Sequence, residues 1–111
     1  MTEEEMVEMY LLRALSQNEP APISTLVVAL RQQAEGAGLM PPGQLAKLDD
    51  ILVGRALMGW RRSEPPLVDF DYDPADLLPG GNIRQGAEGM WSMTDAGDVE
   101  LDRLERLAGV V

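Results

Sequence analysis

Gly89-Met90-Trp91-Ser92-Met93-Thr94-Asp95-Ala96-Gly97 contains the sharpest change of pattern in this chain of 111 residues. Its first five residues are short and apolar, which is typical of a β-strand. Thr94 is then a residue type that caps helix N-termini, and Gly97 allows another segment to approach the first turn closely. Leu101 and Leu104 continue at helical spacing. We therefore expect a strand at 89–93 that leads into a closing helix from Thr94 or Asp95.

The segment before this stretch predicts a partner strand. Within residues 67–73, apolar and acidic side chains alternate, which places Val68, Phe70 and Tyr72 on one face of a strand and the aspartates on the other. Such alternation is typical of a half-buried strand. Residues 74–88 are turn-like and centred on Pro79-Gly80-Gly81-Asn82. The two strands are therefore expected to form a hairpin with a long, glycine-rich tip.

Three amphipathic segments precede the hairpin. The spacing of apolar residues predicts helices at 3–17 and 24–35, and a third that Pro41-Pro42-Gly43 opens and that runs to Arg62. Gly54 and Gly59 are weak points where a bend of the third helix is expected. The residues expected on the outer stripe of this helix are Lys47, Asp50, Gly54, Met58 and Arg61.

This order of elements, together with residues 89–97, resembles the winged-helix (winged helix-turn-helix) domains. In them an aromatic strand ends in a Leu-Thr-x-x-Gly-like turn before a closing helix, and Met93 stands here where leucine is usual. The chain is similar to small winged-helix regulators and to the N-terminal domains of Mrr-type restriction enzymes. The resemblance implies an α+β, mostly α fold with three helices, a β-hairpin wing and a C-terminal helix, as one domain over residues 1–111. It also implies that the third helix reads the DNA major groove while the wing touches the backbone or minor groove.

The composition restricts both partners and chemistry. Nineteen acidic side chains against nine Lys+Arg give a net charge of −10, which opposes contact of most of the surface with nucleic acid or anionic membranes. No apolar run approaches about 20 residues, and the acidic start Met-Thr-Glu-Glu-Glu does not resemble a secretory signal. The sequence therefore predicts a cytoplasmic protein that does not bind membranes.

Cysteine and histidine are both absent. Their absence removes disulfides, thiol nucleophiles, the usual general base and the commonest zinc ligands. No phosphate-binding glycine loop is present either. The Asp-x-Asp-x-Asp spacing of residues 69–73 resembles the start of an EF-hand, but Pro74 and Gly80 replace the glycine and glutamate that calcium needs. We expect no cofactor, no metal and no enzymatic activity.

The charge is unevenly distributed along the chain. Residues 24–63 contain five Lys or Arg against three acids and form the only basic segment. A non-enzymatic, DNA-associated regulator is therefore our first hypothesis, although Arg61 and Arg62 also suit the negative end of the helix dipole. The candidate DNA contacts are Gln44, Lys47, Arg55, Arg61, Arg62 and Arg84.

The acidic wing supports an alternative hypothesis. Asp69, Asp71, Asp73 and Asp76 form either a solvated strand face or a docking surface for a protein with a basic surface. Alternate strand residues lie about 6.6 Å apart, close to the spacing of successive phosphates, so the row suits a DNA-mimic inhibitor or adaptor. Ile51, Gly54 and Met58 are further candidates for contact with a partner helix, in an adaptor complex or a homodimer.

Overall fold

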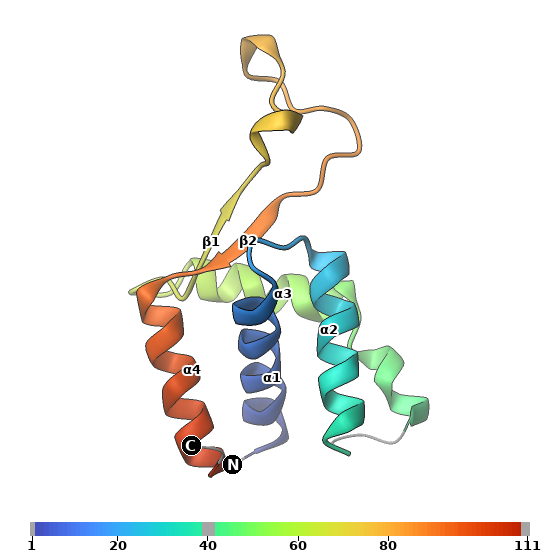
Figure 1. The fold of residues 1–111 in the computed structure, drawn as a ribbon, viewed down its shortest axis with the longest axis vertical. Helices are drawn as coiled ribbons and strands as arrows, with labels where there is room; N and C mark the ends of the chain where they lie inside the picture. The colour runs from blue at the N-terminus through green and yellow to red at the C-terminus, as the bar shows by residue number, and fades with distance from the viewer. Residues whose placement is uncertain (1, 39–41, 110–111) are drawn as a thin grey trace.

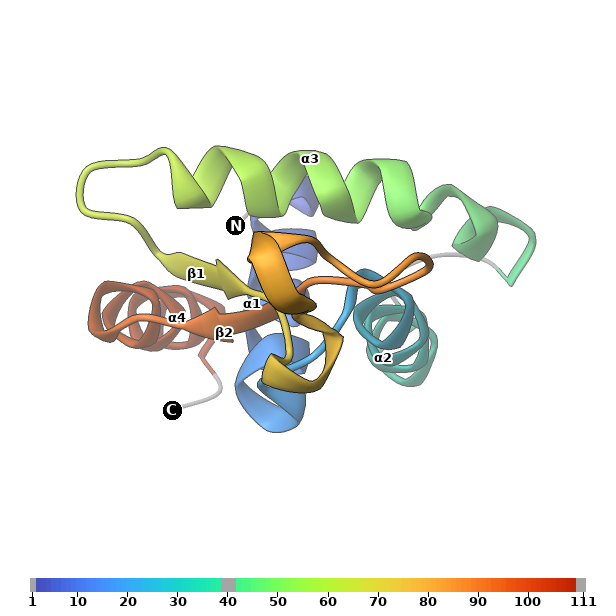
Figure 2. The same cartoon turned by 90° about the horizontal axis from the view of Figure 1, so that it is seen from above.

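The computed structural model describes residues 2–38 and 42–109. Three helices run side by side, a fourth crosses them, and a long hairpin projects away from the helices (Figures 1 and 2). The α-helices and strands are α1 (Glu3–Asn18), α2 (Ile23–Gly36), α3 (Asp50–Arg61), β1 (Val68–Asp71), β2 (Met90–Met93) and α4 (Asp95–Ala108). Short 3₁₀ helices occur at η1 (Pro42–Lys47), η2 (Pro74–Asp76) and η3 (Pro79–Gly81). The mostly helical α+β class with a hairpin is confirmed, in an arrangement compatible with the winged-helix fold.

Side-chain caps start α1 and α4, and the cap at Thr94 is the one that the sequence predicts. The Thr2 hydroxyl accepts a bond from the Glu5 N–H at 3.1 Å, and the Glu5 carboxylate accepts one from the Thr2 N–H at 3.2 Å. The Thr94 hydroxyl accepts a bond from the Gly97 N–H at 3.1 Å and donates to the Pro66 carbonyl at 2.6 Å. These bonds satisfy helix N–H groups that otherwise have no partner inside the helix.

The prediction of one continuous third helix is wrong. The chain forms η1, breaks at Leu48 and Asp49, and begins α3 at Asp50. The Asp49 carboxylate caps α3 by accepting a bond from the Leu52 N–H at 2.9 Å. Arg31 of α2 donates to the Leu48 carbonyl at 2.9 Å. The cap and this bond hold the break in place, and buried Leu48 anchors it in the core.

The glycines expected to weaken the third helix do not interrupt it. Gly54 and Gly59 both lie within α3, and the interruption occurs before its first residue. A glycine inside a helix costs only about 1 kcal/mol, which packing of the rest of α3 on the core can offset. Pro41, which was expected to open the helix, lies outside the described residues.

The sheet is an antiparallel pair in which Phe70 lies opposite Trp91. Both strands are shorter than the predicted ranges 67–73 and 89–93. Ala21, between α1 and α2, exchanges two backbone hydrogen bonds with Trp91, at 3.0 and 2.8 Å. The α1–α2 connection therefore adds a single-residue bridge to the far side of β2, and β2 lies between it and β1.

One cluster of apolar side chains joins the helices and the sheet. Residues from each α-helix and from both strands contribute to it, including Leu12, Leu26, Leu57, Leu104, Val68 and Trp91. Trp91 is 3% exposed and anchors the second strand in the core. Because α3 and the base of the hairpin both pack on this cluster, their outer surfaces are held in a defined relative position.

Candidate nucleic-acid interface

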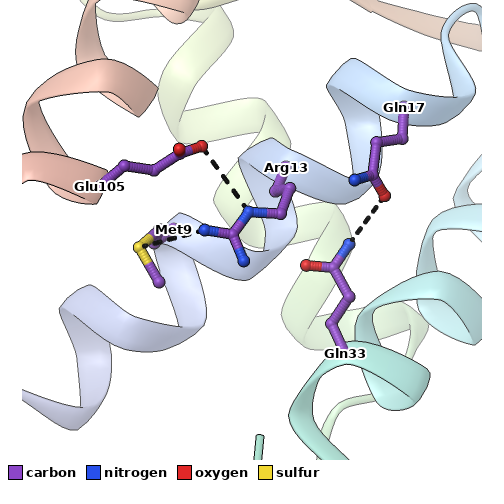
Figure 3. A network of polar contacts seen from close by, with 5 residues as sticks. All are labelled: Met9, Arg13, Gln17, Gln33 and Glu105. Carbon is purple, nitrogen blue, oxygen red and sulfur yellow. Dashed lines mark hydrogen bonds and ion pairs between the residues drawn. The ribbon is translucent and has the colours of Figure 1, made fainter. Parts of the chain in front are cut away.

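Two arginines of the helical body have structural partners. The Arg13 Nε atom lies 3.6 Å from a carboxylate oxygen of Glu105, so Arg13 connects α1 to α4 (Figure 3). Its guanidinium also lies 5.5 Å from the centre of the Tyr10 ring. Arg31 donates to backbone carbonyls at the break before α3. The charge of Arg13 is therefore paired with a carboxylate, and the guanidinium of Arg31 is held by neutral carbonyl oxygens.

Three more arginines pair with carboxylates on the hairpin and on α4. Arg84 lies 2.6 Å from Asp76 within the hairpin, and their backbones are bonded as well. On α4, Arg103 pairs with Glu100, and Arg106 pairs with Asp102 at 2.8 Å. Arg84 was predicted to contact DNA and Asp76 to contact a protein. The structure instead joins these two residues to each other, so the hairpin has no net positive site.

The remaining four cations, Lys47, Arg55, Arg61 and Arg62, all lie on η1 or at α3. None of them has an ion-pair partner within the described residues. Arg61 lies 5.2 Å from the centre of the Phe70 ring, at the junction between α3 and β1. The cations that have neither a carboxylate nor a backbone carbonyl as partner within the described residues therefore all lie on η1 or at α3.

The outward stripe of α3 differs from the predicted one. Ile51, Arg55, Met58 and Arg62 are exposed, and at about 100° per residue they share one narrow face. Ile51 is 60% exposed and Met58 is 36% exposed. Of the predicted stripe, Asp50, Met58 and Arg61 are exposed on α3, whereas Gly54 is half-buried and Lys47 lies on η1, outside α3. The exposed face of α3 therefore extends beyond the predicted stripe to Ile51, Arg55 and Arg62. Gln44 and Lys47 are exposed on η1, beside this face rather than on it.

Gly54 does not belong to an open contact surface. It is half-buried, and a β-carbon at this position would lie 3.7 Å from the Ile23 side chain. The helix that approaches Gly54 is therefore α2 of the same chain. Ile51 and Met58 are exposed, whereas Gly54 is half-buried beside α2.

The aspartates of β1 cover an open strand edge. The Asp69 carboxylate accepts a bond from the Phe70 N–H at 2.9 Å, and Asp71 accepts one from the Tyr72 N–H at 2.8 Å. The backbone N–H and C=O of Phe70 point to this open edge. The backbone groups of Phe70's partner in β2, Trp91, bond to Ala21 and not to Phe70. Covering exposed strand donors with charge opposes edge-to-edge association. Two of the predicted protein contacts thus have a structural role.

Asp73 also has a local role. Its carboxylate accepts a bond from the Ala75 N–H at 2.9 Å and caps η2. Asp69, Asp71 and Asp73 are nevertheless exposed and have no ion-pair partner within the described residues. Three of the four predicted acidic positions therefore remain accessible to a cation.

The hairpin tip presents an apolar surface that the sequence reasoning missed. Leu77, Leu78 and Ile83 are 49%, 43% and 36% exposed. A bridge between Leu77 and Ile83 and a 2.7 Å bond from the Leu78 N–H to the Asn82 carbonyl order the tip. In the sequence, two adjacent leucines within a turn-like segment could have indicated this surface, because turns rarely need aliphatic side chains.

The N-terminal part of α1 carries crowded negative charge. Partial burial, together with the charges of Glu100, Glu4 and Glu5, raises the pKa of the Glu8 carboxyl, and Arg103 opposes this shift. A raised pKa in the folded state means that folding favours the protonated carboxyl. The stabilisation is complete below the unfolded value of about 4.3 and is lost as pH rises through the folded value.

Glu8→Gln is therefore expected to raise the melting temperature at pH 7, because it removes a charge that opposes folding. The difference from the unmodified protein should shrink as pH falls through the acid range. Thermal denaturation followed by circular dichroism at several pH values measures both trends. Glu35→Gln, on the exposed surface of α2, is the matched control. A rise in melting temperature for Glu8→Gln that is the same at every pH would contradict the raised pKa of the Glu8 carboxyl.

Residues 2–38 and 42–109 contain no group of three or more His, Cys, Asp or Glu side chains arranged to hold a metal ion. In the same part of the chain, no helix is long and apolar enough to cross a membrane. Comparison with protein-family models, curated proteins and solved structures gave no match.

Proposed function

We propose that this chain is a winged-helix domain that binds duplex DNA through α3 as a non-enzymatic regulator. The helix order, the hairpin, the Ala21 bridge beside β2 and the closing helix α4 support the winged-helix assignment. The observation that supports DNA binding is the location of the unpaired cations. All four lie on η1 or at α3, whereas the other five Lys and Arg side chains have partners within the chain.

The outward stripe of α3 suits a DNA groove. Arg55 and Arg62 can contact phosphates or guanine edges, and Ile51 and Met58 offer apolar contacts of the kind that thymine methyl groups accept. The acidic remainder of the surface repels the polyanion, so only the α3 side approaches it productively. The net charge of −10 then orients the domain rather than excluding DNA.

Arg55→Glu combined with Arg62→Glu tests this function. Fluorescence anisotropy with labelled duplexes should show an affinity about 10–100-fold lower than that of the unmodified domain. The slope of log K against log salt concentration should fall by about 2, because two phosphate contacts are lost. The matched control, Arg103→Glu with Arg106→Glu on α4, makes the same change in net charge. Equal losses in both double variants, or no binding at low salt, would contradict the proposal.

The exposed carboxylates of β1 favour a second candidate function, the binding of a protein with a basic surface. Asp69, Asp71 and Asp73 have no ion-pair partner within the described residues and belong to the same hairpin as the apolar tip. Asp69→Asn with Asp71→Asn removes the charge and keeps an oxygen that can accept the local N–H bonds. This variant should lose partner capture in a pull-down while DNA affinity is maintained. The α3 variant should show the opposite pattern.

A further inference from the structure

A groove separates α1 from α3 on a different side of α3 from its outward stripe. Its volume is about 570 Å³. The residues that line it are Glu3, Glu4, Val7, Glu8, Lys47, Leu48, Leu52 and Ala56. α1 packs mainly on α2 and α4, and α3 packs mainly on α2, so the two walls diverge. The groove is therefore bounded by two crossing helices.

The floor of the groove is apolar. Val7 of α1 and Leu52 and Ala56 of α3 are only partly buried, and Leu48 is fully buried beneath them. Partly buried aliphatic side chains in a concave surface gain free energy when a ligand removes them from water, at about 25 cal/mol per Å². The shape and chemistry of the floor match the apolar stripe of an amphipathic helix.

The rim of the groove is acidic. Glu3, Glu4 and Glu8 lie along it, and Lys47 is its one cation. The raised pKa of the Glu8 carboxyl reflects partial burial and negative neighbours, so the local field is incompletely compensated. A cationic ligand would relieve this repulsion, whereas a nucleic-acid backbone would increase it.

We propose that the α1–α3 groove binds an amphipathic helix of a partner protein whose apolar stripe is flanked by Lys or Arg. Leucine-type side chains of the partner occupy the floor at Val7, Leu52 and Ala56. Its cations pair with Glu4 and Glu8. This surface is independent of the proposed DNA-binding stripe, so either activity can fail in experiments without the other.

A synthetic helical peptide of Leu and Lys, about 14 residues or four turns long, is the probe. Two further peptides test the two parts of the proposal: one replaces every Lys with Glu, and one scrambles the order so that the apolar stripe is lost. Titration into isotope-labelled protein should shift the backbone amides of Val7, Glu8, Leu52 and Ala56 with the first peptide only. Equal binding of either comparison peptide, or shifts confined to other surfaces, would overturn the proposal.

Matched variants separate specific docking from general attraction to an acidic protein. Glu4→Lys should weaken binding of the Leu/Lys peptide about tenfold, whereas Glu35→Lys, the same change in charge on exposed α2, should have a much smaller effect. Ala56→Gln should block the floor, and Ala46→Gln on exposed η1 should not. Circular dichroism checks that each variant is folded. Equal effects within either pair would overturn the assignment of the groove.

Discussion

Gly97→Ala is expected to destabilise the domain by about 3 kcal/mol, at the upper end of the cost of overpacking. A β-carbon at Gly97 would overlap the backbone carbonyl oxygen of Leu67. That carbonyl cannot move away freely, because it accepts a bond from the Thr94 N–H at 3.2 Å and the Leu67 N–H donates to Trp60 at 3.0 Å. The whole of α4 must therefore shift. Urea denaturation followed by circular dichroism measures the change in the free energy of unfolding.

Gly59→Ala is the matched control for this substitution. Gly59 is exposed within α3, and a β-carbon there would meet nothing within 4 Å. The same chemical change should stabilise the domain by up to about 1 kcal/mol, because alanine has the higher helix propensity. If Gly97→Ala lowers the free energy of unfolding and Gly59→Ala raises it, the clash with Leu67, and not the loss of a glycine, causes the destabilisation. An unchanged free energy of unfolding for Gly97→Ala would contradict the close packing of α4 against Leu67, the residue that precedes β1.

Leu57→Ala is expected to reduce the free energy of unfolding by about 2–5 kcal/mol. Leu57 is 0% exposed and belongs to the central cluster. Its truncation removes buried methyl groups and leaves a cavity beneath α3 that the surrounding helices fill only in part. Because α3 carries the cations of the proposed interface, the loss should also weaken the proposed DNA binding at temperatures near the transition. Urea denaturation and anisotropy at two temperatures measure the two effects.

Met58→Ala tests whether the effect of Leu57→Ala depends on burial. Met58 is the next residue of the same helix and lies on its outward stripe, 36% exposed. Its truncation should change the free energy of unfolding by no more than about 0.5 kcal/mol. Similar losses at the two positions would show that the helical phase assigned to α3 is wrong.

Local patterns predicted the elements of the fold well. The capping residue Thr94, the alternation in 67–73 and the apolar run at 89–93 all depend on neighbours within a few residues. Each is confirmed by hydrogen bonds or strand pairing. The close approach expected at Gly97 is confirmed at the Leu67 carbonyl. Strand ends were less predictable, because strands end where cross-strand pairing ends.

The candidate site was less predictable, and Asp49 explains one error, the start of α3. An aspartate before an apolar repeat is a capping signal, and reading it so would have started α3 at Asp50. Which face of α3 is exposed depends instead on how the core packs against it, and this packing leaves Ile51, Arg55 and Arg62 outward. The groove at Leu52 and Ala56 likewise depends on how α1 and α3 are placed in the tertiary structure.

The sequence by itself determined the mostly helical class, the hairpin, the capped start of the closing helix and the basic character of the segment 24–63. These properties arise from backbone preferences, short-range periodicity and composition. Only the tertiary structure decided which charges are free. Arg31 lies against the break before α3, Arg13 contacts Glu105 of α4, and Arg84 pairs with Asp76. Carboxylates pair with Arg13 and Arg84, and a backbone carbonyl holds Arg31, because these groups lie within a few ångströms in space. In the sequence the partners are 8 to 92 positions away.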